Sequence, residues 1–153
     1  MKGFKRKLAF LLAFVMIFSL QATPVFAATD TKTANTKASI YLTPGTSGTT
    51  NTVSFNFTSL SPDATVKGLK ITAPLTKHQG TAAVIVNSFV VISPSGTIAT
   101  IPVASGNSAT TSAFNGEKAK GTWRMYINCS CPSGGLPNAY GSSTYNPTMT
   151  ITS

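Results

Sequence analysis

Acidic residues are almost absent from this 153-residue sequence, which contains only Asp30, Asp63 and Glu117. A calcium site needs about six to eight oxygen ligands, several of them from carboxylates. Cleavage of a glycosidic bond needs two carboxyl groups that face each other across the substrate. Three acidic residues so far apart in the sequence therefore disfavour both kinds of site.

Histidine and cysteine are as scarce. The single histidine, His78, lies between Lys77 and Gly80 in a segment that we predict to be a solvated loop. A catalytic triad would also need a nucleophile and an orienting acid within hydrogen-bond distance, and the sequence has no Gly-x-Ser-x-Gly motif. One histidine and a Cys-x-Cys pair without a second cluster are not typical of a zinc site. We therefore expect no metal, no cofactor and no catalytic constellation.

The N-terminus has the three parts of a secretory signal peptide. Four basic residues precede an apolar run from Leu8 to Phe18, and a site of small residues ends at Ala27. The run is shorter than the roughly 20 residues that a membrane-spanning helix needs. We therefore favour a cleaved signal peptide, residues 1–27, over a membrane anchor, and we expect a secreted protein without a stable anchor.

Removal of residues 1–27 changes the charge of the protein. Four of the 12 basic residues lie in that segment, so eight remain, and with three acidic residues the net charge falls from +9 to +5. The remaining basic residues are dispersed and are not interleaved with aromatic residues, which argues against nucleic-acid binding. They can attract the protein to an anionic surface such as a cell wall, or they can simply keep it soluble.

The rest of the sequence favours strands, because it lacks long segments of helix-forming residues and is rich in Thr, Ser, Gly and Val. Residues 28–37 are polar, and we expect a flexible leader there, followed by a single domain at residues 38–153. Alternation of apolar and polar residues at 52–58 and 122–128 predicts half-buried strands. The nearly apolar segment 82–92 predicts a central strand that is buried on both faces. Seven to eight short strands with turns between them predict an all-β fold, an antiparallel, jelly-roll-like β-sandwich.

Several motifs in the second half occur in an order that is typical of a known family. The sequence Ser-Pro-Ser-Gly-Thr at 93–97 follows an apolar strand, a loop with Phe114 comes next, and Gly-Thr-Trp at 121–123 begins another strand. This order resembles the P domain of proprotein convertases and its bacterial relatives, over about residues 66–152. The resemblance implies a β-sandwich that packs against a protease domain or is attached to a secreted enzyme. The chain lacks the acidic turns that this family usually carries.

The residues that carry the resemblance are ones that a β-fold needs for structural reasons. Pro94 and Gly96 favour a tight turn between two strands. Gly121 permits a close backbone approach or a left-handed conformation. Trp123 is the only tryptophan and occupies an inward position, so we expect it to fill the core. We interpret these four residues and Phe114 as structural.

Cys129 and Cys131 lie at the start of a segment, residues 129–146, that we predict to be irregular. Disulfides persist in exported proteins, and a local disulfide could form here if the two Cα atoms came within about 4.4–6.8 Å. A disulfide to another chain and a redox-active pair are the alternatives, although no basic neighbour lowers a thiol pKa. The sequence leaves all three open.

These observations predict a secreted, non-catalytic binding module. Its partner would be an unknown protein, such as an exported protease, or a component of the cell wall, and not a nucleic acid. The alternative is a thiol-redox protein or another small secreted enzyme that uses Cys129 and Cys131. The oligomeric state is left open.

Overall fold

The computed structural model describes residues 27–103 and 105–153, and all regular structure in them is β. The predicted signal peptide therefore lies, except for Ala27, outside the described residues. No helix in this part of the chain is long and apolar enough to cross a membrane. The strands are β1 (Thr29–Thr33), β2 (Ala38–Leu42), β3 (Ser47–Thr49), β4 (Val53–Phe57), β5 (Gly68–Thr72), β6 (Leu75–Gly80), β7 (Ile85–Ile92), β8 (Ile98–Pro102), β9 (Ser108–Thr111), β10 (Gly121–Ser130), β11 (Gly141–Tyr145) and β12 (Thr148–Thr152).

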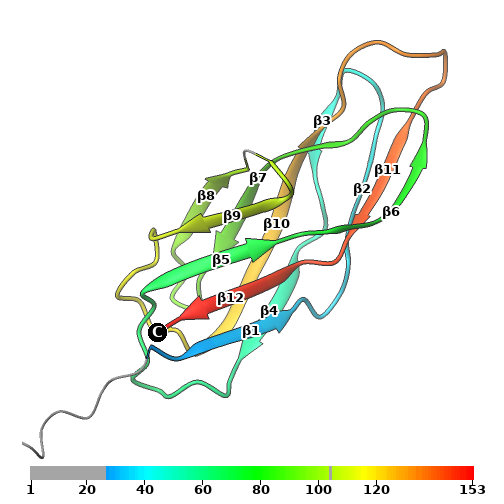
Figure 1. The fold of residues 1–153 in the computed structure, drawn as a ribbon. Helices are drawn as coiled ribbons and strands as arrows, with labels where there is room; N and C mark the ends of the chain where they lie inside the picture. Colours follow the sequence, from blue (N-terminus) through cyan, green and yellow to red (C-terminus); the bar gives the residue numbers. More distant parts are fainter. Residues whose placement is uncertain (1–26, 104) are drawn as a thin grey trace, which may run out of the picture.

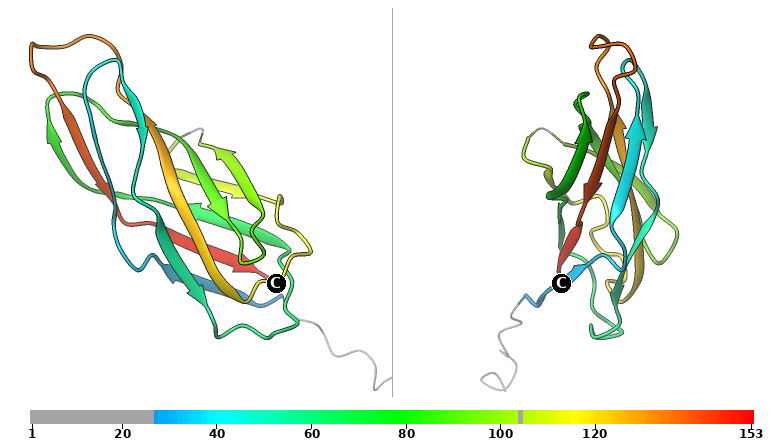
Figure 2. Two further views of the ribbon diagram at one scale, coloured as in Figure 1. Left: turned by 180° about the vertical axis from the view of Figure 1, so that it is seen from behind. Right: turned by 90° about the vertical axis from the view of Figure 1, so that its right-hand side faces the viewer.

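The strands form two layers (Figures 1 and 2). The front layer contains a four-stranded sheet of order β1-β12-β5-β9. Beyond one end of these strands, a three-stranded sheet of order β2-β11-β6 continues the same layer. The back layer has the order β3-β10-β7-β8, with β4 also paired to β10. Four pairs of consecutive strands, β1 and β2, β3 and β4, β5 and β6, and β11 and β12, are single extended segments interrupted once. The twelve strands therefore correspond to eight longer segments.

The eight segments pair from the two ends of the chain inwards, as the two arms of a single long hairpin do. The first pairs with the eighth through β1 and β12, and the second with the seventh through β4 and β10. The third pairs with the sixth through β5 and β9, and the fourth with the fifth through β7 and β8. This winding is that of a jelly roll. It confirms the all-β sandwich, although with more and shorter strands than the seven to eight predicted.

Two prolines interrupt neighbouring strands of the front layer at the same level. Pro147 separates β11 from β12 and Pro74 separates β5 from β6, because proline has no N–H for the ladder. The hydrogen bonding nevertheless continues past them. The N–H of Ala34 donates to the carbonyl of Pro147 (2.9 Å), and the N–H of Asn146 donates to the carbonyl of Pro74 (3.0 Å). The outer side of the front layer is therefore one long, bent surface.

The core lies between the layers and follows the predicted alternation. The buried apolar side chains of β4 and β10 are Val53, Phe55, Phe57, Trp123, Met125, Ile127 and Cys129. The strand at 85–92 is buried on both faces only over residues 88–91, and Ile85 and Asn87 remain exposed. β7 lies between β10 and β8, so a central strand is confirmed at 85–92, whereas burial on both faces is confirmed only at 88–91.

The flexible leader was predicted wrongly for part of its length. Residues 29–33 form β1, which pairs with β12 from Thr29 opposite Thr152 to Thr33 opposite Thr148. Ala28 and Ser153 also exchange two backbone hydrogen bonds of 3.0 and 2.8 Å. Pairing with a strand more than a hundred residues away orders this polar segment, which has no alternation of apolar and polar residues.

Two other segments that we predicted to be irregular are strands. The predicted loop around His78 is β6, and the segment after Cys131 contains β11. The six residues of β6 are all exposed, so they show no alternation of apolar and polar side chains. Pairing with β11, from Gly80 opposite Gly141 to Leu75 opposite Tyr145, holds β6 in place.

Candidate functional site

The residues that carry the family resemblance gather around one turn of the sandwich. The turn between β7 and β8 is closed by the N–H of Gly96, which donates to the carbonyl of Ser93 (3.0 Å). Gly121, at the start of β10, packs directly against this turn. Its φ is +139°, and a Cβ added there would lie 2.8 Å from two ring carbons of Pro94. The predicted close approach at Gly121 is thus present, and it joins the two motifs.

Trp123 and Phe114 form the core beneath this turn. Both side chains are fully buried, and their rings meet edge to face with centroids 5.1 Å apart. The indole N–H of Trp123 donates to the backbone carbonyl of Ala119 (2.9 Å), which satisfies its one polar atom. The cluster has the geometry of a structural core, with no unpartnered polar group directed at a ligand.

The carboxylates of Glu117 and Asp30 take part in contacts within the fold. Burial alone would raise the pKa of Glu117, but hydrogen bonds from the hydroxyls of Ser95, Ser93 and Thr97 outweigh it and lower that pKa. Asp30 forms an ion pair with Lys32 (3.1 Å) on another part of the sandwich. Within residues 27–103 and 105–153, no three His, Cys, Asp or Glu residues are close enough to hold a metal ion.

Cys129 and Cys131 are free and buried, so the local disulfide, one of the three possibilities that the sequence left open, is not formed in this structure. Cys129 is only 1% exposed and Cys131 only 3%. Burial raises the pKa of the Cys129 thiol to about 11, although a hydrogen bond with Tyr145 acts in the opposite direction. Reactive cysteines are exposed and have lowered pKa values. Both properties of Cys129 are therefore the reverse of what a redox-active pair needs.

His78 contacts a serine but does not complete a triad. Its Nδ1 lies 2.9 Å from the hydroxyl oxygen of Ser143 on the neighbouring strand. Ser143 is 1% exposed and cannot meet a substrate without a change in structure. Among the described residues, no carboxylate hydrogen-bonds to His78, so the acid that would orient the ring is not supplied.

The burial of the thiols leads to a simple prediction. In the native protein at pH 8, neither Cys129 nor Cys131 should react with iodoacetamide within an hour, because both are buried and the Cys129 thiol stays protonated. Unfolding in urea should expose both, and mass spectrometry should then find two added groups. Rapid labelling of the native protein would contradict the structure and revive the thiol-redox alternative.

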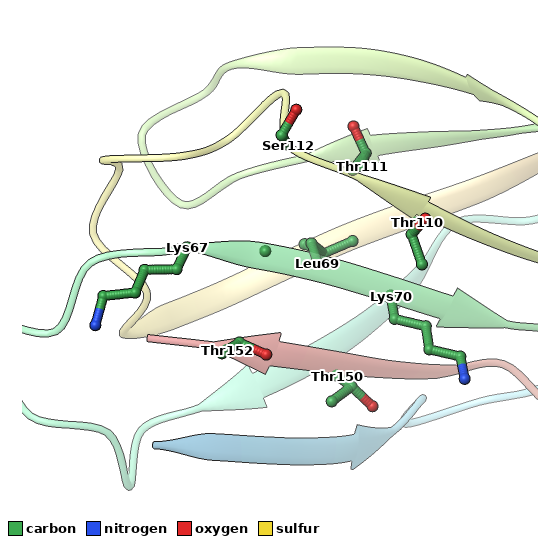
Figure 3. A pocket seen from close by; sticks show the side chains of 9 residues that line it. Lys67, Leu69, Lys70, Thr110, Thr111, Ser112, Thr150 and Thr152 are labelled. Atoms are coloured by element: carbon green, nitrogen blue, oxygen red, sulfur yellow. The ribbon is translucent and has the colours of Figure 1, made fainter. Parts of the chain in front are cut away.

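A hollow of about 670 Å³ lies on the outer side of the front layer, over β12, β5 and β9 (Figure 3). Lys67 and Lys70 stand at its two ends. The register places Thr150, Lys70 and Thr110 side by side on three neighbouring strands. Its remaining lining residues are Gly68, Leu69, Thr111, Ser112 and Thr152.

The hollow combines positive charge, hydroxyl groups and open space. In the described part of the chain, the residues that line it include no carboxylate, so nothing in the hollow neutralises Lys67 and Lys70. Gly68 lies between them, and a Cβ there would meet no heavy atom within 4 Å. Because glycine has no side chain, the surface of the sheet is open at this position. The arrangement can bind anionic groups and exchange hydrogen bonds with hydroxyls.

Sequence reasoning missed this hollow, although it considered attraction to an anionic surface. Lys67 and Lys70 are counted among dispersed basic residues, and the threonines beside Lys70 come from strands 40 and 80 residues away, at Thr110 and Thr150. One signal was visible. Thr-x-Thr-x-Thr occurs twice, at 29–33 and 148–152, and it places three threonines on one face of each strand.

The fold and the hollow define a jelly-roll β-sandwich with a basic, hydroxyl-rich recess on one face. No family model and no curated protein matches the sequence. Among solved structures, the chain is similar to the crystal structure of FLHE, with 18% sequence identity and a TM-score of 0.41. The match covers 82% of this chain and 96% of that one. The resemblance to P domains stays a prediction.

Proposed function

We propose that the protein is a secreted, non-catalytic module that binds an anionic polymer of the cell surface in the hollow over β5, β9 and β12. The main observation behind this proposal is that Lys67 and Lys70 stand at the two ends of the hollow. Gly68 lies between them and has no side chain to fill the space. The surrounding hydroxyls come from β9 and β12.

The charges favour an anionic ligand. Lysine ammonium groups attract carboxylates and phosphates at long range, and this attraction weakens as salt screens it. Asp30 forms its ion pair away from the hollow, and Glu117 hydrogen-bonds to the turn at Ser95. The hollow therefore keeps its positive field, which adds to the net charge of +5 expected after loss of the signal peptide.

The polar lining favours a hydroxylated ligand over a protein surface. A surface that holds a protein partner is usually apolar at its centre, whereas the side chains around this hollow are mostly threonine, serine and lysine. This argues for a wall polymer over an exported protease. The thiol-redox alternative is weaker, because the thiols are buried.

The test compares lysine variants in binding to anionic polymers. With residues 1–27 removed, the protein should bind poly(glycerol phosphate) and alginate in calorimetry at low salt, and neutral dextran much more weakly. Substitution of both Lys67 and Lys70 by glutamine should weaken binding about tenfold or more, since each exposed charge contact contributes up to about 1 kcal/mol.

The matched control removes the same charge elsewhere. Lys120 and Arg124 are exposed and do not line the hollow, and Arg124 lies on β10 of the back layer. Their double substitution by glutamine should change the affinity less than about twofold, as expected for charges outside the site. Equal losses in the two double variants, or no binding by the unaltered protein, would overturn the proposal.

A further inference from the structure

A polar track continues from the hollow along the whole front layer. On β12 and β11, every second residue faces outward and is partly exposed, while the residues between them are buried. The outward residues are Thr152, Thr150, Thr148, Asn146, Thr144 and Ser142. Because Pro147 only bends this segment, the six side chains form one continuous row.

The neighbouring strands widen the row with side chains of the same kind. The hydroxyl of Thr31 lies 2.8 Å from that of Thr150, and the hydroxyl of Ser39 lies 3.2 Å from that of Thr144. On the other side, Lys77 stands opposite Thr144. These contacts hold the hydroxyls in fixed positions before any ligand arrives, which lowers the entropic cost of binding.

The track ends at two exposed tyrosines. The rings of Tyr41 and Tyr140 stack with centroids 5.3 Å apart and an angle of 19° between their planes. Tyr41 is 61% exposed and Tyr140 is 38% exposed. An aromatic face that is open to water on a polar surface suits the apolar C–H face of a sugar ring, whose hydroxyls can then bond to the polar neighbours.

We propose that the ligand is an extended anionic glycan that lies along β12 and β11 from the lysine hollow to the Tyr41–Tyr140 stack. This inference rests on the proposed function and names its ligand class. At roughly 3.3 Å per residue, Thr152 and Tyr140 are about 40 Å apart along the strands, so several sugar units bind at once. Lys67, Lys70 and Lys77 pair with its acidic groups, and the tyrosines stack on a ring.

The decisive experiment measures affinity against ligand length. Alginate oligosaccharides of increasing length should bind the protein more tightly until they span the track, and then no longer gain, because added units bind outside it. Tyr41→Ala should weaken binding of the longest oligosaccharides about tenfold. It should leave the shortest ones unchanged, since these bind in the hollow alone.

Two comparisons separate the possible outcomes. Poly(glycerol phosphate) has no sugar ring, so its affinity should not change in Tyr41→Ala. Tyr126→Ala, on β10 of the back layer, should leave every affinity unchanged. Length-independent binding, or equal affinities in Tyr41→Ala and the unaltered protein, would overturn the glycan track but leave the lysine hollow standing. Absence of any binding would overturn both.

Discussion

Trp123→Ala should lower the free energy of unfolding by about 4 kcal/mol, as large-to-small changes of buried aromatic residues do. The substitution removes the largest fully buried side chain of the core and the edge-to-face contact with Phe114. It also leaves the carbonyl of Ala119 without its hydrogen-bond donor. The loss should therefore combine a cavity with an unpaired polar group.

Urea unfolding, followed by circular dichroism because tryptophan fluorescence is lost, would measure the effect. Trp123→Phe keeps much of the volume but loses the indole N–H, and it should cost about half as much. Tyr126→Ala, at a partly exposed position on the same strand, should cost less than either. A loss below about 1 kcal/mol for Trp123→Ala would show that this residue does not fill the core as described.

Gly80→Ala should destabilise the protein by about 3 kcal/mol, through backbone strain and a steric overlap together. Gly80 has a φ of +92°, which side chains other than glycine rarely adopt. A Cβ there would also overlap the backbone carbonyl oxygen of Tyr140, and a carbonyl cannot rotate away as a side chain can. The change should thus also displace Tyr140 and weaken binding of long glycans.

Gly96 provides a matched control for this substitution. Its φ is +94°, almost the same as that of Gly80, but a Cβ there would meet no heavy atom within 4 Å. Gly96→Ala should therefore show the strain alone, about 1–2 kcal/mol. Thermal unfolding of the two variants would compare them. If the two variants lost the same amount of stability, the overlap with Tyr140 would contribute nothing to the loss. The described geometry at Gly80 would then be wrong.

The sequence predicted the parts of the fold in which one strand alternates between core and solvent. The segments at 52–58 and 122–128 alternate clearly, and they contain β4 and most of β10 in the back layer. The turn at 93–97 and the core position of Trp123 were likewise readable from residue type. In each case the signal lies within a few residues, so no partner strand has to be known.

The front layer was harder to predict because its strands depend on distant partners. The strands β1, β6 and β9 bury no large apolar side chain, and their sequences resemble loops. The pairing of Thr29–Thr33 with Thr148–Thr152 spans nearly the whole described chain. Local composition cannot show such a pairing, which is why the flexible leader was expected.

The candidate site was hidden for the same reason. Lys70, Thr150 and Thr110 are far apart in the sequence and become neighbours only in the sheet. Tyr41 and Tyr140 are separated by almost a hundred residues, and their stacking follows from the pairing of β2 with β11. The cysteines, in contrast, were conspicuous in the sequence and are buried in the structure.

The central claim is that the outer side of the front layer binds an anionic polymer. The most direct test is to follow the backbone amide signals of the ¹⁵N-labelled protein by NMR while alginate oligosaccharides are added. We predict that the signals of Gly68, Thr150 and Ser142 shift, while those of Thr100 and Thr122 on the back layer stay in place. Shifts confined to the back layer, or no shifts at saturating alginate and poly(glycerol phosphate), would contradict the claim.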